Sequence, residues 1–558
     1  MSLEQLFTPQ GEALSGTPWT CYPRPQLRRK SYVNLNGWWE FSVCKEGFDR
    51  KIQVPFCPES ALSGIGEHFH ENCALRYRRR FPCPDGEGRV LLHIGAADQK
   101  LTCYVNGQKI GTHVGGYEAI TFDITDALQE DNELVLVCRD DLRDKSLPYG
   151  KQTLKRGGMW YTPVSGIWQT VWLERVPREY IQTLLIDNHG TAVTIRIEPP
   201  LDGTVSVANL GEYPLEGGQV TIAPEAPHLW SPEDPFLYDF TVTAGEDRVE
   251  SYFALRTLDV RQVGGYRRLC LNGQPYFFHG LLDQGYWPDG LFTPASSECY
   301  VNDILAAKAL GFNTLRKHIK VEAEEFYYQC DRLGMIVFQD MVNNGPYDFL
   351  RDTALPTAGV QTLNDRKMHP DPRTRTRFLQ GLEATVDQLR NHPCIVYWTI
   401  FNEGWGQFDS DNVYAHLKAL DDSRWIDSTS GWFRRKQSDV DSRHVYFRPI
   451  RLKAGAQPLM LSEFGGYVFK VEGHSFNPDK TYGYGKFQDL QSYRDAVERL
   501  YRKQVIPAAQ KGLCGAIYTQ ISDVEDEANG LLTYDRKVTK LEPAQMLPLA
   551  QALQDACK

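Results

Sequence analysis

The hydrophobic periodicity of this chain changes near its middle, and that change limits the possible folds more than any other sequence feature. Between about residues 30 and 260, short alternating or β-branched runs are separated by Gly, Pro, Asp and Asn. The run from Leu101 to Val105 ends in Asn106-Gly107, a pair typical of a tight hairpin turn. No helix-period segment of useful length interrupts this region, so we expect β-sandwiches.

From about residue 265 the pattern becomes strand-like runs alternating with helix-period segments. The expected strands are 276–282, 312–318, 335–341, 394–403, 425–431, 444–447, 459–464 and 513–520. Helical spacing is seen between several of them, for example at Phe326, Cys330 and Leu333, where Gly334 ends the segment. Since consecutive parallel strands need crossover helices, eight strands predict a (β/α)8 TIM barrel, with the polar segment 342–373 as an excursion after strand three.

These two patterns divide the chain into three predicted domains. One boundary falls near Pro177, and a second falls where strands give way to helices, between about residues 255 and 265. We therefore expect a β-sandwich domain over residues 1–177, a small Ig-like β-sandwich over 178–262 and the barrel over 263–558.

Composition removes several classes of function. Asp and Glu outnumber Lys and Arg by 71 to 61, for a net charge of −10, which argues against nucleic-acid binding. No stretch approaches the roughly 18 apolar residues of a membrane span, and the first thirty residues lack a signal-peptide core. Thirteen cysteines without repeated spacing predict reduced thiols and a cytoplasmic location.

A metal site is the weaker interpretation of one short segment. His68, His70, Glu71 and Cys73 lie close together in the sequence, but in a Gly-rich loop of the β region and without metal-site spacing. No phosphate-binding glycine motif follows any strand. We expect no metal and no other cofactor.

Two glutamates stand where catalytic groups of a barrel belong, at the carboxyl ends of strands. One apolar run leads into Asn402-Glu403 and another into Ser462-Glu463. Each glutamate alone could be an exposed carboxylate capping a helix, but the pair suits glycoside hydrolysis. One carboxyl group must keep its proton, so its pKa must be raised. The other must stay ionised, and Arg316 is the obvious cation to hold its pKa down. Asn402 could bind a sugar hydroxyl next to the reacting carbon.

The residues around these positions resemble glycoside hydrolase family 2 over nearly the whole chain. The resemblance is carried by YPRPQLRRKSYVNLNGWWEF (22–41), VPFCPESALSGI (54–65), YTPVSGIWQTVWLE (161–174), FNTLRKHIK (312–320), FNEGWGQFD (401–409) and LSEFGGY (461–467). It implies a jelly-roll sugar-binding-like domain, an Ig-like sandwich and a catalytic barrel. It also implies Glu403 as acid/base and Glu463 as nucleophile of a retaining enzyme, with carboxyl groups about 5–5.5 Å apart.

Further residues are expected around the pair because of their positions after strands. They are Asp283, Arg316, His318, Asp340, Asn402, Trp432, His444, Tyr446 and Tyr518. Asp340 could accept sugar hydroxyls or cap a helix, and Trp432 could stack on a sugar or lie in the core. His444 is equally a core histidine or a site residue, and we expect Tyr446 to donate to Glu463. His318 matches the family pattern only loosely.

Several functions stay open at this point. The first is an exo-acting β-galactosidase acting on an oligosaccharide or glycoside, with a β-glucuronidase or an arabinofuranosidase as alternatives. The Asn-x-Lys clamp of β-glucuronidases is not evident in ANGLLTYDRK (528–537). A non-catalytic carbohydrate-binding protein and an endo-acting glycanase are the other candidates. A homo-oligomer is an expectation from the resemblance.

Overall fold

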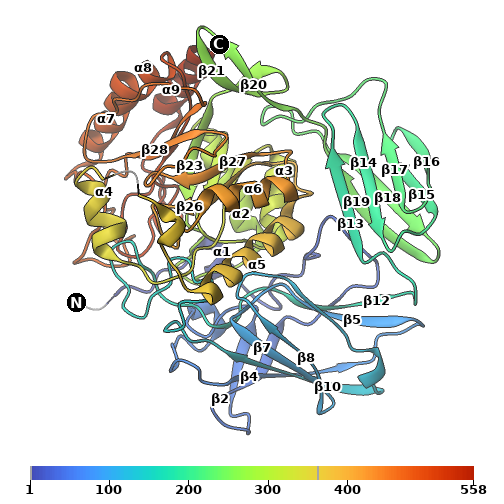
Figure 1. Ribbon diagram of the computed structural model, residues 1–558. Helices are drawn as coiled ribbons and strands as arrows, with labels where there is room; N and C mark the ends of the chain where they lie inside the picture. Colours follow the sequence, from blue (N-terminus) through green and yellow to red (C-terminus); the bar gives the residue numbers. More distant parts are fainter. Residues whose placement is uncertain (1–2, 361–362) are drawn as a thin grey trace.

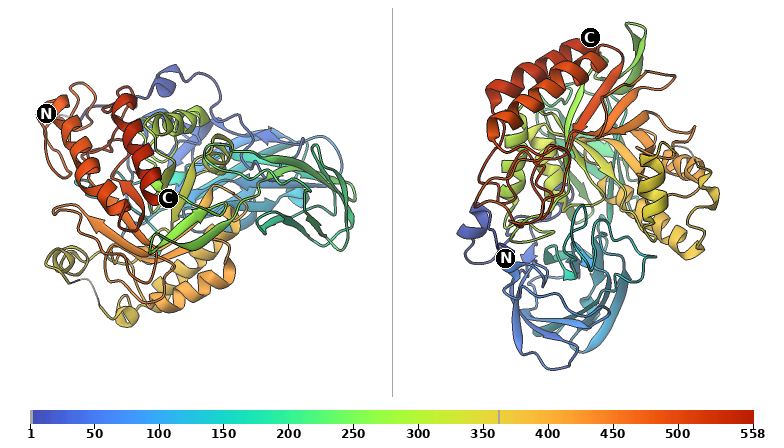
Figure 2. Two further views of the ribbon diagram at one scale, coloured as in Figure 1. Left: turned by 90° about the horizontal axis from the view of Figure 1, so that it is seen from above. Right: turned by 90° about the vertical axis from the view of Figure 1, so that its left-hand side faces the viewer.

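The computed structural model describes residues 3–360 and 363–558, and it consists of two β-sandwiches beside a barrel (Figure 1). The amino-terminal sandwich, the second sandwich and the barrel follow one another along the chain, as the colours show, and Figure 2 gives two further views. This is the predicted multidomain fold. The domain boundaries at 177/178 and 262/263 stay predictions, and residues 1–2 of the first domain lie outside the described residues.

The amino-terminal sandwich packs a six-stranded sheet, in the order β3-β2-β4-β10-β7-β8, against a four-stranded sheet, β1-β12-β5-β9. A separate two-stranded sheet is formed by β6 and β11. The core between the sheets is built from alternating apolar residues such as Phe41, Leu92 and Leu136. The elements are α1 (Pro9–Ala13), β1 (Val33–Asn34), β2 (Gly37–Val43), β3 (Arg50–Val54), η1 (Ala61–Ser63), β4 (Leu75–Pro82), β5 (Arg89–Ile94), β6 (Ala97–Asp98), β7 (Lys100–Val105), β8 (Gln108–Val114), β9 (Ile120–Asp123), η2 (Thr125–Ala127), β10 (Asp131–Arg139), β11 (Gly166–Ile167) and β12 (Val171–Val176).

The predicted hairpin turn is present between β7 and β8. Asn106 and Gly107 both have left-handed backbone angles, with φ of 52° and 79°. A two-residue turn of this kind matches the twist of the flanking strands and needs residues that tolerate positive φ, which Asn and Gly do.

The second sandwich packs the three-stranded sheet β13-β14-β17 on the four-stranded sheet β16-β15-β18-β19. Its own core includes Ile195, Val205 and Phe253, all buried. The strands are β13 (Thr183–Asn188), β14 (Val193–Glu198), β15 (Gly203–Val207), β16 (Gly211–Leu215), β17 (Gln219–Ile222), β18 (Tyr238–Ala244) and β19 (Asp247–Phe253). A small sheet of β20 (Leu258–Val263), β21 (Tyr266–Leu271) and β22 (Gln274–Pro275) leads from it to the barrel.

Eight parallel strands form the barrel in the order β27-β26-β25-β24-β23-β30-β29-β28. All eight predicted strands are present, with ends shifted by a few residues. The strands are β23 (Phe278–Asp283), β24 (Thr314–Lys317), β25 (Ile336–Asp340), β26 (Ile395–Asn402), β27 (Trp425–Ser430), β28 (Asp441–Val445), β29 (Leu459–Phe464) and β30 (Leu513–Tyr518). The helical elements around them are α2 (Ser297–Ala309), α3 (Glu324–Leu333), η3 (Leu350–Ala354), α4 (Leu355–Thr357), η4 (Asp365–Lys367), α5 (Pro372–Leu389), α6 (Ser410–Leu420), α7 (Leu490–Leu500), η5 (Tyr501–Val505), α8 (Ile506–Ala509) and α9 (Pro543–Cys557).

The barrel departs from regular strand–helix alternation between β27 and β29. Residues 431–440 and 446–458, all of them described, contain bends and irregular segments rather than crossover helices. The end strands β27 and β28 are joined through side chains, since the hydroxyl oxygens of Ser430 and Ser442 lie 3.2 Å apart. The expected excursion 342–373 contains η3, α4 and η4, and its residues 361–362 lie outside the described residues.

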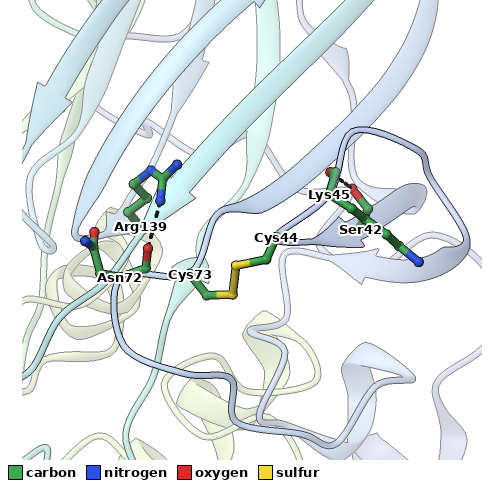
Figure 3. The surroundings of a disulfide bond; sticks show 6 residues. All are labelled: Ser42, Cys44, Lys45, Asn72, Cys73 and Arg139. Atoms are coloured by element: carbon green, nitrogen blue, oxygen red, sulfur yellow. Dashed lines mark hydrogen bonds between the residues drawn. A yellow bond between two sulfur atoms is a disulfide. The ribbon is translucent and has the colours of Figure 1, made fainter.

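One disulfide contradicts the expectation that every thiol is reduced. Cys44, just after β2, is bonded to Cys73, just before β4 (Figure 3). The two segments pair in one sheet, with Val43 opposite Leu75, which brings the sulfurs together although 29 positions separate them. The sequence spacing carried no sign of this pairing. Cys73 is therefore not a free metal ligand, and the cytoplasmic location stays a prediction.

Among the helices of the described residues, none combines the length and the apolar character that crossing a membrane would require.

Candidate active site

The buried guanidinium of Arg316, at the end of β24, connects the ends of four barrel strands. Its Nε donates to Asp340 Oδ1 at 2.9 Å, and its Nη2 donates to Asn402 Oδ1 at 2.9 Å. Its Nη1 donates to the carbonyl of Ser462 at 3.0 Å and to Glu463 Oε1 at 3.1 Å. The planar fork of arginine suits such a network, and removing one member of a buried charge pair typically costs about 3–5 kcal/mol.

Glu463, the penultimate residue of β29, is held as a carboxylate. Although burial alone would raise its pKa, the neighbouring charges of His444, Arg316 and His318 and the hydrogen bond from the Tyr446 hydroxyl lower the pKa to about 2. Both carboxylate oxygens are engaged, because Arg316 binds Oε1 and Tyr446 binds Oε2. The side chain is thus both charged and fixed in orientation.

Glu403 directly follows β26 and faces Glu463 across the end of the barrel. Its Oε1 lies 2.8 Å from His444 Nδ1, and its side chain is 18% exposed, against 6% for Glu463. One carboxylate oxygen of Glu403, one ring nitrogen of His444 and one carboxylate oxygen of Glu463 lie within 4.8 Å of one another. The backbone of Glu403 is left-handed, with φ of 52°, a strained conformation that non-glycine residues adopt mostly at functional sites.

Three other predicted residues surround the pair. His444 is joined to Glu403 and, through Nε2, to the Ser430 hydroxyl at 3.0 Å, so it is not an isolated core histidine. Tyr446 makes the expected hydrogen bond to Glu463 and also lies 3.0 Å from Thr519 Oγ1. Trp432 packs its edge toward His444, with ring centroids 5.6 Å apart.

Asp340 is bound on both carboxylate oxygens by neighbouring side chains of the site. Its Oδ1 accepts from Arg316 and its Oδ2 lies 2.8 Å from His318 Nδ1, so both oxygens are occupied within the protein. The side chain is buried, and it caps no helix. Asp340 therefore orients Arg316 and His318, and a contact of its oxygens with a sugar stays a prediction.

Asp283 and Tyr518 are not brought to the pair, which corrects the two expectations based on position alone. Asp283 Oδ2 accepts from Lys317 at 2.7 Å, and Lys317 points away from Arg316 because neighbouring residues of a strand face opposite sides. Tyr518, the last residue of β30, is buried, and its hydroxyl accepts from the Tyr467 backbone N–H at 3.1 Å.

Sequence reasoning missed most of the aromatic rings around the pair. Tyr484 stacks on Tyr446, with centroids 4.0 Å apart. Trp160, from the amino-terminal domain, stacks on Trp405 with centroids 4.9 Å apart, and Tyr347 meets both rings edge-on. Tyr484 and Tyr347 could have been suspected, because they lie in the loops after β29 and β25. Nothing in the sequence around Trp160 points to the barrel.

Two close carboxylates at the carboxyl ends of barrel strands, one held ionised and one more exposed, are the arrangement that glycoside hydrolysis needs. The comparisons agree. The TIM barrel domain model of the glycosyl hydrolases family 2 matches residues 265–542, and a second model of this family matches residues 186–256. Together they cover more than half of the chain, and the protein belongs to glycoside hydrolase family 2.

Relatives within this family differ in the sugar they are named for. A β-galactosidase of Thermoanaerobacter pseudethanolicus is 26% identical over 73% of this chain and 58% of its own length. A putative β-glucuronidase of Formosa agariphila is 25% identical over 57% of this chain and 39% of its own. The chain thus spans less than two thirds of either relative.

Solved structures share the fold over nearly the whole chain. A β-glucuronidase from an uncultured Clostridium species has a TM-score of 0.72 at 18% identity, covering 95% of this chain and 99% of that one. A β-galacturonidase from Eisenbergiella tayi, bound to galacturonate, has a TM-score of 0.69 at 18% identity, covering 96% and 99%. At this identity the likeness concerns the fold alone.

Proposed function

We propose that this glycosidase is a retaining, exo-acting enzyme that releases a terminal sugar by double displacement, with a β-galactoside as the first candidate substrate. The observation that carries the proposal is that a carboxylate oxygen of Glu403 lies within 4.8 Å of a carboxylate oxygen of Glu463. Retaining enzymes have carboxyl groups about 5–5.5 Å apart, whereas inverting enzymes leave about 6.5–9.5 Å for a water molecule.

The two carboxyl groups have different tasks in this mechanism. Glu463 attacks the anomeric carbon while Glu403 gives its proton to the leaving oxygen, and a glycosyl ester on Glu463 results. Glu403 then takes a proton from water, which attacks the anomeric carbon and releases the sugar with its original configuration. Arg316 and Tyr446 fix Glu463, and His444 fixes Glu403.

The galactoside is proposed because relatives named β-galactosidase match this chain, among them the Thermoanaerobacter enzyme. The lack of an Asn-x-Lys segment in ANGLLTYDRK (528–537) disfavours a β-glucuronide. A binding protein without turnover would not need a charged carboxylate held by Arg316 opposite a second, more exposed carboxyl. An endo-acting enzyme would be distinguished by product sizes over time.

A panel of 4-nitrophenyl glycosides tests this proposal. We expect the β-galactopyranoside to be released faster than the β-glucuronide, the β-galacturonide and the α-L-arabinofuranoside, measured as kcat/KM. A preference for either uronide would replace the sugar but keep the mechanism. Release of none of the four by folded protein would refute the proposed function.

The pH profile tests the role of Tyr446. Glu463 acts while ionised, and its pKa is held at about 2, so it limits activity only at very low pH. Tyr446→Phe removes a hydrogen bond to the ionised form, so the pKa should rise and the acidic limb of kcat/KM should move up by about 1 pH unit. Tyr328→Phe, on the far helix α3, is the control, and an unshifted limb would contradict the role of Tyr446.

A further inference from the structure

Lys151 is a buried cation that the mechanism above does not use. It comes from the amino-terminal domain, in the segment between β10 and β11, and only 9% of it is exposed. Within residues 3–360 and 363–558, its ammonium group makes no hydrogen bond or ion pair, and its contacts are with two rings: the Nζ atom lies 5.2 Å from the centroid of Trp405 and 5.9 Å from that of Tyr161. The Nζ atom itself is not fully enclosed, so the hydrogen bonds that the protein does not accept from it are open to a ligand in the site.

The residues that flank Lys151 in the chain hold it in place through their hydrogen bonds. On one side, Tyr149 donates its backbone N–H to the carbonyl of Asn343 at 3.1 Å and its hydroxyl to the carbonyl of Gly345 at 2.8 Å. On the other side, Gln152 Nε2 donates to Asp98 Oδ2 at 2.9 Å. The segment is therefore fixed to the barrel loop after β25 and to its own domain at once, and Lys151 is pre-positioned beside Trp405, two residues after Glu403.

A carboxyl group stands near this ammonium group without pairing to it. Glu527, in the loop after β30, is buried and accepts a hydrogen bond from the Tyr161 hydroxyl, on the ring that Lys151 also faces. Burial raises the pKa of the Glu527 carboxyl. The positive charge of Lys151 lowers this pKa and the negative charge of Glu463 raises it, so Lys151 and Glu463 are both close enough to Glu527 to act on its charge. Lys151 and Glu527 still form no ion pair, since their nitrogen and oxygen atoms are more than 4.0 Å apart.

We propose that Lys151 and Glu527 together bind one hydroxyl group of the terminal sugar, the ammonium donating to it and the carboxyl oxygen accepting from it. This rests on the proposed function. A hydroxyl can accept and donate at once, so it satisfies both groups across the gap between them. The carboxylate of a uronic acid could accept from Lys151, but it has no proton to donate to the carboxyl oxygen of Glu527. The sugar is therefore neutral at this position, and the amino-terminal domain supplies a specificity residue.

The experiment compares Lys151→Met with 4-nitrophenyl β-D-galactopyranoside and its 2-, 3-, 4- and 6-deoxy analogues. Loss of a hydrogen bond from a charged group predicts a fall in kcat/KM of roughly 10-fold to 100-fold on the parent. One deoxy analogue, which lacks the bound hydroxyl, should lose much less, and Glu527→Gln should be least harmful on the same analogue. Lys151→Arg should recover part of the activity. Lys155→Met, exposed in the same segment, is the matched control and should change nothing.

The outcomes separate this inference from the proposed function. An equal loss on the parent and on all four analogues would mean that Lys151 only supports the structure, and no loss would mean that it has no role; either result overturns the inference alone. A loss confined to the 4-nitrophenyl β-galacturonide would overturn the hydroxyl in favour of a carboxylate. Wild-type enzyme that cleaves no neutral glycoside would overturn both proposals.

Discussion

Glu463→Ala should remove hydrolysis of aryl glycosides almost completely, by roughly 10⁵-fold or more in kcat. The carboxylate that Arg316 and Tyr446 hold is then missing, and no glycosyl ester can form. Substrate binding should persist, since the other residues of the site are unchanged. The measurement is the steady-state release of 4-nitrophenol.

Azide distinguishes a lost nucleophile from a damaged site. A small anion can enter the space left by the side chain and attack the same face of the sugar, giving a glycosyl azide of inverted configuration. Glu472→Ala, an exposed glutamate of the loop after β29, serves as the control and should keep full activity. A variant at Glu463 that still turns over, or an azide product of retained configuration, would contradict the assignment of the nucleophile.

Glu403→Ala should slow hydrolysis by an amount that depends on the leaving group. General acid catalysis is worth about 10²- to 10⁴-fold, and a poor leaving group such as a sugar or an alkyl alcohol needs all of it. A 2,4-dinitrophenyl glycoside leaves with little protonation, so its first step should change little, and added azide should speed its second step. We would measure kcat/KM over a series of aryl glycosides with different phenol pKa values.

The slope of that series is the result that matters. The variant should show a steep dependence of kcat/KM on the pKa of the leaving phenol, and the wild-type enzyme a shallow one. Equal loss on every glycoside would mean that Glu403 supports the site without donating the proton. His444→Gln, which keeps a polar group against Glu403 Oε1, should give a smaller loss with the same trend.

The barrel could be predicted closely from the sequence because each strand is a buried apolar run with clear ends. Since catalytic groups belong at the carboxyl ends of barrel strands, that rule alone placed Glu403, Glu463 and Arg316 near one another. The missing crossover helices around β28 could not be foreseen in this way. Segments 431–440 and 446–458 carry no helix period, but only the structure shows that they cross without helices.

Predictions for single residues failed where strand register and partners decide the outcome. Asp283 stands opposite Lys317 in the pairing of β23 and β24, so the two charges neutralise each other away from the pair. Asp340 is bound by Arg316 and His318 rather than capping a helix. Strand register and the choice of ion-pair partner depend on three-dimensional packing, so they cannot be read from the residues next to Asp283 or Asp340 in the sequence.

Contacts between domains were beyond the reach of the sequence for the same reason. Lys151 and Trp160 lie more than two hundred positions from Trp405, and they reach it only because the amino-terminal domain packs against the open end of the barrel. The Cys44–Cys73 bond lies within one domain, but it too depends on a pairing that is distant in sequence, that of β2 with β4.

Trapping the glycosyl-enzyme intermediate tests the central claim most directly. A 2-deoxy-2-fluoro galactoside with a 2,4-dinitrophenyl leaving group should form the ester quickly and release it slowly. Mass spectrometry of the digested protein should then show the added sugar on the peptide that contains Glu463. A sugar attached to another residue, or turnover of ordinary galactosides with no trapped intermediate and inverted product, would contradict double displacement through Glu463.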